Sequence, residues 1–186
     1  SIMELIEFAK ANPGRINYAS GGNGSTPHLS GELFKALAGV DLTHVPYKGN
    51  GPAITDLLAG QVQLLFTRLP PVASFVKSGR LKLLAVTGAK RHASLPDVAT
   101  VQEGGVPDYE VITWFGFLAP ARVPKPIVDR LNADIGRALQ APDVRERLAS
   151  LGADLGTSSP EAFATLLRDE ISKWSRVVKS AGIKVD

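Results

Sequence analysis

The stretch that decides the fold lies between residues 17 and 29 and reads Asn17-Tyr18-Ala19-Ser20-Gly21-Gly22-Asn23-Gly24-Ser25-Thr26-Pro27-His28-Leu29. This pattern predicts the end of a strand, a glycine-rich loop and the start of a helix. Three glycines in four positions allow a sharp turn and a close approach of backbone N–H groups to a ligand. Thr26 is the expected N-cap, and Pro27 suits the first helical position, where a missing N–H costs nothing.

The glycine loop predicts an anion site, because N–H dipoles of the loop and of the helix N-terminus converge on one point. It is not a phosphate loop, because no Gly-Lys-Ser/Thr follows it. It is not a dinucleotide fingerprint either, because Pro27 stands where the last glycine should be. Without a lysine in the loop, a carboxylate fits the neutral donors better than a polyphosphate. The alternative is a polar turn that binds nothing. The candidate ligand contacts are Ser20, Gly21, Gly22, Asn23, Gly24, Ser25 and His28.

Composition limits the classes of function. The 186 residues are 44% hydrophobic, enough for a sizeable core in one or two domains. Lys and Arg are scattered and aromatic residues make up 6% of the chain, so the sequence does not favour a nucleic-acid partner. No apolar run approaches the ~20 residues of a membrane-spanning helix. The absence of cysteine suits a bacterial periplasmic protein and does not exclude a cytosolic one.

Strand and helix patterns alternate through the first half of the chain. Strands are expected at 15–20, 42–45, 62–66 and 81–86, with helices near 2–9, 29–38, 52–59 and 70–76. This α/β alternation with short glycine turns predicts a mostly parallel sheet with flanking helices on both faces.

The second half is different, because it is mainly helical. After a segment with one short helix expected at 100–103 and an apolar run at 111–118, three helices are predicted between residues 124 and 178. They bracket a single strand candidate at 153–155. Amphipathic helices need a surface to cover. Either these helices pack on the first sheet, or part of the protein lies outside this chain.

Several motifs, in order along the chain, resemble one family: Asn17-Tyr18-Ala19-Ser20-x-Gly22-Asn23-Gly24-Ser25, His28-Leu29, His44-Val45-Pro46-Tyr47-Lys48-Gly49 and Trp114-Phe115-Gly116. The family is the tripartite tricarboxylate transporter receptors, also called the Bug family. The resemblance implies a bacterial periplasmic solute-binding protein without a cofactor, which captures a small carboxylate for membrane transporter subunits. It also implies a two-lobed periplasmic binding fold of the second type.

The same resemblance implies how the chain is divided. Residues 1–113 would form lobe two, and residues 114–186 would form a crossover and the C-terminal helical part of lobe one. The N-terminal part of lobe one would be missing, which leaves that lobe incomplete. Apolar helix faces without their sheet must find another partner, so we expect either self-association of the chain or a mobile C-terminal third.

Ligands of open parallel sheets bind beyond the carboxyl ends of the strands. Tyr47 and Thr67 follow strand ends, and Arg68 and Trp114 complete the candidate contacts. Val62, Leu64 and Phe66 are expected on one face of their strand, and Gln63, Leu65 and Thr67 on the other. Many family members have Phe-Asp-Asn where this chain has Phe66-Thr67-Arg68. The loss of the acidic residue predicts a preference for a mono- or dicarboxylate without an amino group.

An enzyme is the alternative, namely a transferase or hydrolase that acts on a small carboxylate on a related α/β scaffold. Ser20, Ser25, His28 and Asp41 suggest a hydrolase triad, but the chain has no Gly-x-Ser-x-Gly elbow. We expect a structural or supporting role for His28, a core or hinge position with satisfied hydrogen bonds for His44, and a solvated His92. Three isolated histidines without paired carboxylates do not predict a metal site.

Overall fold

The computed structural model describes residues 1–183 and divides them into two compact units. Unit 1 comprises residues 1–113 together with the chain from Arg176 onward, and unit 2 comprises residues 114–175. The end of the chain from Arg176 therefore groups with unit 1, whereas the resemblance assigned it to the same part as residue 114.

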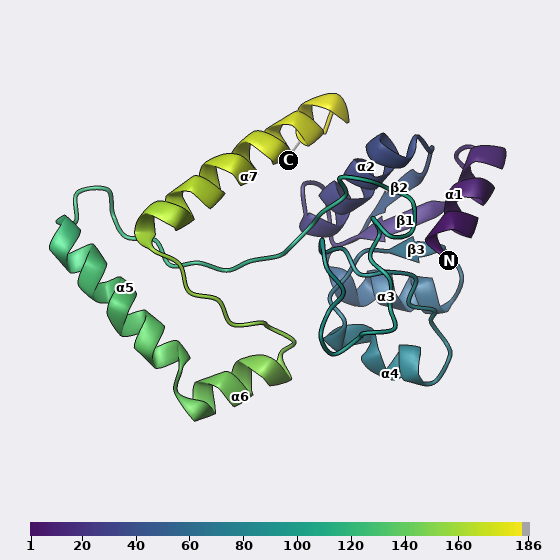
Figure 1. Cartoon of the computed structure of the whole chain (residues 1–186). Helices are drawn as coiled ribbons and strands as arrows, with labels where there is room; N and C mark the ends of the chain where they lie inside the picture. Colours follow the sequence, from purple (N-terminus) through teal and green to yellow (C-terminus); the bar gives the residue numbers. More distant parts are fainter. Residues whose placement is uncertain (184–186) are drawn as a thin grey trace. The chain divides into compact units, whose positions relative to one another are not determined.

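Unit 1 is an α/β unit built on a parallel sheet (Figure 1). The sheet has the strand order β2-β1-β3, and β1 pairs in parallel with both neighbours. This confirms the predicted α/β class. The elements, in chain order, are α1 (Ile2–Ala11), β1 (Asn17–Ser20), α2 (Thr26–Ala38), β2 (Thr43–Pro46), α3 (Asn50–Leu58), β3 (Leu64–Leu65), the 3₁₀ turn η1 (Pro70–Val72) and α4 (Ala73–Lys77).

Helices α2 and α3 cover opposite faces of β1, because successive side chains of a strand alternate between the faces. Tyr18 faces α2 so closely that a Cβ added to Gly31 would lie 2.3 Å from the tyrosine ring. Ala19 faces α3, where it forms a buried cluster with Ala53 and Val62. The predicted cover on both faces of the sheet is confirmed.

The structure differs from two of the predicted strands, one of which is shorter and one of which does not form. The third strand pairs over two residues only, Leu64 and Leu65. Residues 81–86 form no strand. Instead Val86 makes an isolated parallel bridge with Thr100, because its N–H donates to the carbonyl of Ala99 and its carbonyl accepts from Val101. The segment therefore pairs with a neighbouring loop and not with the sheet.

Two smaller predictions are also wrong. Residues 100–103 form one hydrogen-bonded turn in place of a helix: Thr100 and Glu103 cap each other, and Gly104 and Gly105 end the turn. Residues 153–155 are not a strand.

The predicted face alternation around β3 is wrong for Val62. Val62 and Leu65 pack on the same buried cluster, on the α3 side of the sheet. Phe66 instead contacts the rings of Tyr18, Phe34 and Tyr109. Strict alternation fails because Val62 precedes the two paired residues, where the backbone is not yet extended.

The start of α2 differs from the prediction by one residue. Ser25 is the N-cap, with extended backbone at ψ 157°, and Thr26 is already helical. The Ser25 hydroxyl donates to the carbonyl of Gly22, 2.7 Å away, so it does not cap the helix through its side chain. Gly39 closes α2 in the left-handed conformation, as expected.

Unit 2 contains helices and no strand within its described residues. Its helices are α5 (Lys125–Leu139), α6 (Pro142–Ser150) and α7 (Pro160–Ser180), the last of which ends in unit 1. Neither α5 nor α6 has a buried residue. Its exposed large apolar side chains are Phe115, Phe117, Leu118, Ile127, Leu131, Leu151, Leu166 and Ile171. Within residues 1–183 no helix has the length and apolarity needed to cross a membrane.

Candidate functional site

Three parallel strands end at the same edge of the sheet, at Ser20, Pro46 and Leu65. The glycine loop, residues 21–25, leaves this edge from the central strand β1. Two backbone hydrogen bonds join it to the loop after β2: Tyr47 N–H donates to the Ser20 carbonyl at 3.0 Å, and Gly49 N–H donates to the Gly21 carbonyl at 3.1 Å. The structure thus brings the glycine loop into contact with the segment that follows β2, where Tyr47 lies.

The glycine loop depends on glycine at two positions. Gly22 has φ +136° and Gly24 has φ +72°, a region that residues with a side chain rarely adopt. Gly21 is in close contact with α3, because a Cβ there would lie 2.9 Å from the side-chain oxygen of Asn50, which would have to shift. The loop therefore lies tightly against the start of α3.

The glycine loop has five backbone N–H groups, at residues 21–25, that could face a carboxylate. Three of them donate hydrogen bonds to acceptors in β1, in the loop itself or in α2. Gly22 N–H donates to the Ser20 hydroxyl at 3.1 Å, and Gly24 N–H donates to Nδ1 of His28 at 3.0 Å. Ser25 N–H donates to the Gly22 carbonyl at 3.2 Å. These bonds fix the loop conformation, and an anion would contact these three donors only by sharing them.

His28 and His44 lie behind the loop as a stacked pair. Their ring centroids are 3.7 Å apart and their planes differ by 5°. His44 Nε2 lies 2.6 Å from the hydroxyl of Ser20, and Tyr18 stacks on His44 at 4.9 Å. His44 thus has the hydrogen-bonded position expected for it, and His28 accepts from the Gly24 N–H of the loop.

Burial lowers the pKa of both histidines. The pKa of His44 falls to about 4, because its ring is withdrawn from water and because a charged His28 would repel it. The pKa of His28 is lowered chiefly by burial; the Glu32 carboxylate opposes this shift and Lys35 adds to it. Both rings are therefore neutral near pH 7.

The Ser20–His44 distance is that of a nucleophile and its base, but the surroundings do not suit catalysis. Ser20 has no solvent exposure. Its hydroxyl is also held by both the N–H and the carbonyl of Gly22. We interpret the pair as a support of the loop. Sequence reasoning missed it, although the strand register held the signal: Tyr18 lies opposite His44, and Ser20 lies on the same face as Tyr18.

The remaining candidate residues lie in different environments. Tyr47 donates its hydroxyl to Asp56 of α3 at 2.8 Å, and Arg68 is exposed. The Thr67 hydroxyl is buried without a hydrogen-bond partner, the one such side-chain atom within the described part of the chain. Trp114 belongs to unit 2, where its ring meets Phe163 edge to face at 5.4 Å.

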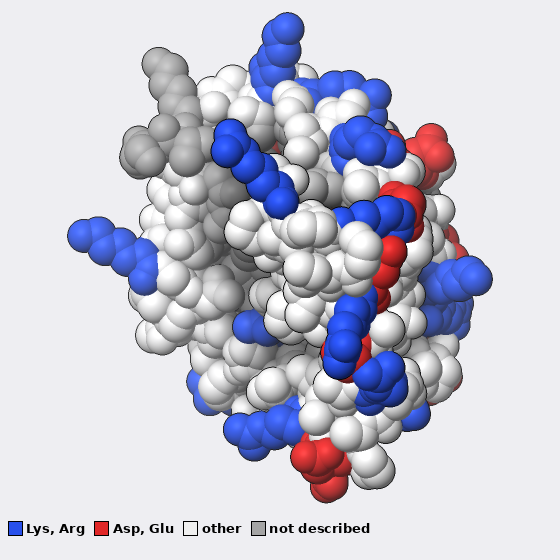
Figure 2. All heavy atoms as spheres, turned by 90° about the vertical axis from the view of Figure 1, so that its left-hand side faces the viewer, with Lys and Arg blue, Asp and Glu red and all other residues white. Residues whose placement is uncertain are grey.

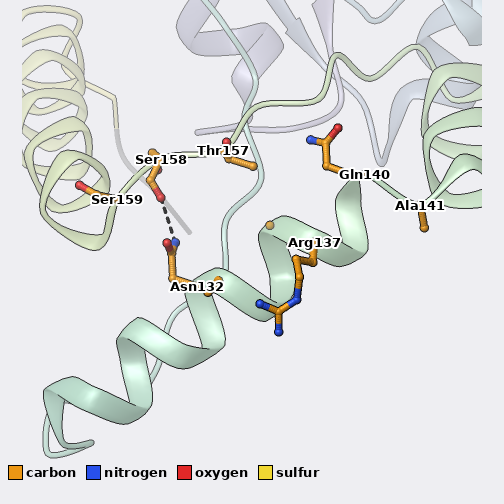
Figure 3. Close-up of a pocket in the computed structure, with 9 residues that line it drawn as sticks. Asn132, Arg137, Gln140, Ala141, Thr157, Ser158 and Ser159 are labelled. Atoms are coloured by element: carbon orange, nitrogen blue, oxygen red, sulfur yellow. Dashed lines mark hydrogen bonds between the residues drawn. The ribbon is translucent and has the colours of Figure 1, made fainter.

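A hollow lies in unit 2, between α5 and the segment before α7 (Figure 3). The three longest polar side chains that line it have partners: Asn132 donates to the Ser158 carbonyl, Arg137 pairs with Asp134, and Gln140 accepts from Arg145. We therefore assign no ligand to this hollow.

Charged side chains do not form a single patch of one sign on the face drawn in Figure 2. Lys and Arg are spread over that face, with Asp and Glu among them. Within residues 1–183, no group of three or more His, Cys, Asp or Glu side chains is arranged to hold a metal ion.

Residues 1–183 match the family described as "Tripartite tricarboxylate transporter family receptor". The chain belongs to this receptor family. One relative, described as the "UPF0065 protein in tcbD-tcbE intergenic region" of Pseudomonas sp. (strain P51), is 40% identical over 95% of this chain and 53% of its own length. Another, "Protein BugT" of Bordetella pertussis, is 36% identical over 100% of this chain and 57% of its own length. The chain thus spans little more than half the length of these two relatives.

Solved structures of similar proteins agree with the fold. A protein of R. palustris solved with adipate, Rpa4515, is 39% identical with a TM-score of 0.82, and the match covers 98% of this chain and 61% of that one. The periplasmic binding protein BugD is 37% identical with a TM-score of 0.77, over 97% of this chain and 61% of its own. MatC of Rhodopseudomonas palustris, solved with bound malate, is 36% identical with a TM-score of 0.74, over 94% and 60%. The predicted periplasmic binding protein fold is confirmed.

Proposed function

We propose that this chain is the ligand-holding part of a periplasmic solute receptor that captures a small carboxylate for a tripartite tricarboxylate transporter. One observation carries the proposal: the glycine loop leaves the carboxyl edge of a parallel sheet and enters the N-terminus of α2. Two similar proteins solved with adipate and malate support a dicarboxylate as the ligand class.

The loop suits an anion because its shape is fixed before the ligand arrives. Hydrogen bonds to Ser20, His28 and the Gly22 carbonyl hold the turn. The dipole of α2 then adds partial positive charge at the exposed side of the loop, where Asn23 and Thr26 lie. Binding in a preformed loop avoids the entropy cost of ordering it.

Substitution at Gly22 tests the loop assignment. Gly22→Val places a branched side chain at φ +136° and should weaken dicarboxylate binding by more than about tenfold, or ~1.4 kcal/mol. The control is Gly39→Ala, which also replaces a glycine of positive φ but at the opposite end of α2, away from the loop. Calorimetry with adipate and malate gives the measurement. Unchanged affinity in a folded Gly22→Val protein would exclude the loop as the site.

Thr67 and Arg68 are proposed to set the choice of ligand. The chain has no acidic residue at this strand end, so a ligand amino group would find no counter-charge there. The unpartnered Thr67 hydroxyl supports a contact at this position, because buried polar groups normally have partners.

The selectivity proposal is tested with a dicarboxylate and its 2-amino analogue. Thr67→Asp should shift preference toward the amino analogue by roughly 1–3 kcal/mol, the range of a charge-assisted hydrogen bond. Arg68→Gln is the comparison variant: it should weaken dicarboxylate binding without favouring the amino analogue. If the unaltered protein already prefers the amino acid, position 67 does not select the ligand.

A further inference from the structure

The glycine loop is connected to two histidine rings through its own N–H groups. Gly24 N–H donates directly to Nδ1 of His28, and Gly22 N–H donates to the Ser20 hydroxyl, which contacts Nε2 of His44. Each ring thus supports one of the two glycines with positive φ. This arrangement is more specific than the packing of two core histidines requires.

The His28 contact needs a neutral ring. Nδ1 accepts a hydrogen bond only when it carries no proton. A protonated His28 would turn a donor toward the Gly24 N–H and break this bond. The stacked geometry adds a second constraint, because two imidazolium rings 3.7 Å apart would repel each other strongly in a partly buried site.

The groups that face the pair come from β1, β2 and α2. Tyr18 of β1 donates its hydroxyl to Glu32 of α2 at 2.6 Å, and Lys35 of α2 pairs with the same carboxylate at 2.9 Å. Glu32 favours the charged form of both histidines and Lys35 opposes it, and at His44 a charged His28 opposes it as well. Phe66, beside Tyr18 after β3, adds apolar surroundings without a charge.

We propose that His28 is a positioning residue that holds the glycine loop in its ligand-binding shape while neutral and releases it when protonated, and that His44, stacked on it, is the second support of the loop. The receptor would then bind its carboxylate at neutral pH and lose it in acid. The inference rests on the proposed function for the binding step, but the loop itself is tested without a ligand.

The first experiment follows the Gly24 amide by NMR from about pH 7.5 to about pH 4.5. In the unaltered chain its signal should move together with the titration of the His28 ring. His28→Asn keeps an acceptor at the δ position and does not titrate, so the signal should stay fixed. His28→Leu removes the acceptor and should shift the signal at all pH values. His92→Asn, which removes the histidine outside the pair, should behave as the unaltered chain.

A Gly24 amide that ignores pH, or that titrates equally in His28→Asn, would overturn the proposal. If the chain unfolds in acid before the amide can be followed, the pH midpoint of acid unfolding tests the proposal instead. It should move to lower pH in the double variant His28→Asn/His44→Gln, which keeps both hydrogen-bonding positions. An unmoved midpoint would contradict the proposal.

The second experiment measures adipate binding by calorimetry at about pH 7.5 and about pH 4.5, because the pKa of His28 is lowered from its usual value. The affinity of the unaltered chain should fall about tenfold more than that of the double variant, which corrects for titration of adipate itself. Equal losses would overturn the proposal. Absence of adipate binding at either pH would count against adipate as the ligand, and the amide titration would still decide whether the histidines hold the loop.

Discussion

Gly31 and Gly51 both lie inside helices, yet their surroundings differ sharply. A Cβ at Gly31 would lie 2.3 Å from the Tyr18 ring, and one at Gly51 would meet nothing within 4 Å. Tyr18 has little room to give way, because it is fully buried and hydrogen-bonded to Glu32. Gly31 is therefore a packing requirement of the α2–β1 contact, whereas Gly51 is not.

Alanine substitutions should separate these two glycines. Gly31→Ala is expected to lower the free energy of unfolding by about 1–3 kcal/mol through overpacking. Gly51→Ala should raise it by about 0.5–1 kcal/mol, since alanine restricts the unfolded chain and suits a helix. Urea titration of both variants gives the comparison, and equal effects would contradict the packing argument.

The unpartnered hydroxyl at Thr67 gives a second residue-scale prediction. Thr67→Val removes a buried polar group and keeps the side-chain shape. We expect the free energy of unfolding to stay level or to rise by about 1 kcal/mol, because no hydrogen bond is lost. Thr165→Val is the control, since its hydroxyl donates to the Glu161 carbonyl. A destabilised Thr67→Val would reveal a partner that the hydroxyl finds in solution.

At the scale of elements, the start of α7 depends on one side chain. Ser159 precedes the helix, and its hydroxyl accepts from the N–H of Ala162 at 3.1 Å. The sequence Ser159-Pro160-Glu161 predicted this cap, which is confirmed. Lys125 of α5 also pairs with Glu161 in the first turn of α7, at 3.4 Å between exposed side chains.

Removal of the cap should loosen the first turn of α7. Ser159→Ala is expected to cost about 1 kcal/mol in local helix stability. Faster hydrogen exchange at residues 162–164 would show it. Ser158→Ala is the matched neighbour, because Ser158 contributes only its backbone carbonyl, to Asn132. Equal exchange in the two variants would mean that the serine hydroxyl does not cap the helix.

At the scale of the whole molecule, unit 2 is the notable part, because its helices leave large apolar side chains exposed. On α5, Ile127 is 51% exposed and Leu131 is 46% exposed. Such surfaces mark contacts with another polypeptide more often than open solvent. We therefore predict that the 186-residue chain self-associates with increasing concentration.

Sedimentation measurements test this prediction. Ile127→Gln/Leu131→Gln should shift the chain toward monomer, because glutamine keeps helix propensity and removes apolar surface. Arg130→Gln on the same helix changes charge alone and should leave association unchanged. A chain that is monomeric at all accessible concentrations would contradict the prediction.

The sequence by itself determined the features that depend on near neighbours. The order strand, glycine loop and helix follows from Gly22, Gly24 and Pro27, since positive φ and a missing N–H restrict the chain locally. The family motifs lie on the same residues. The end of α2 at Gly39 and the cap of α7 at Ser159 could likewise be predicted from the sequence.

Tertiary structure decided what depends on distant partners. Residues 81–86 have a strand pattern but pair with residues 99–101, and Val62 joins Leu65 in one cluster despite the predicted alternation. The Ser20–His44 contact links residues 24 positions apart. Strand register and side-chain packing determine which distant residues meet, and a local sequence pattern carries no information about either. For the same reason the sequence indicated an anion-binding loop, whereas only the folded chain showed that His28 accepts from the Gly24 N–H and that Ser20, in contact with His44, accepts from the Gly22 N–H.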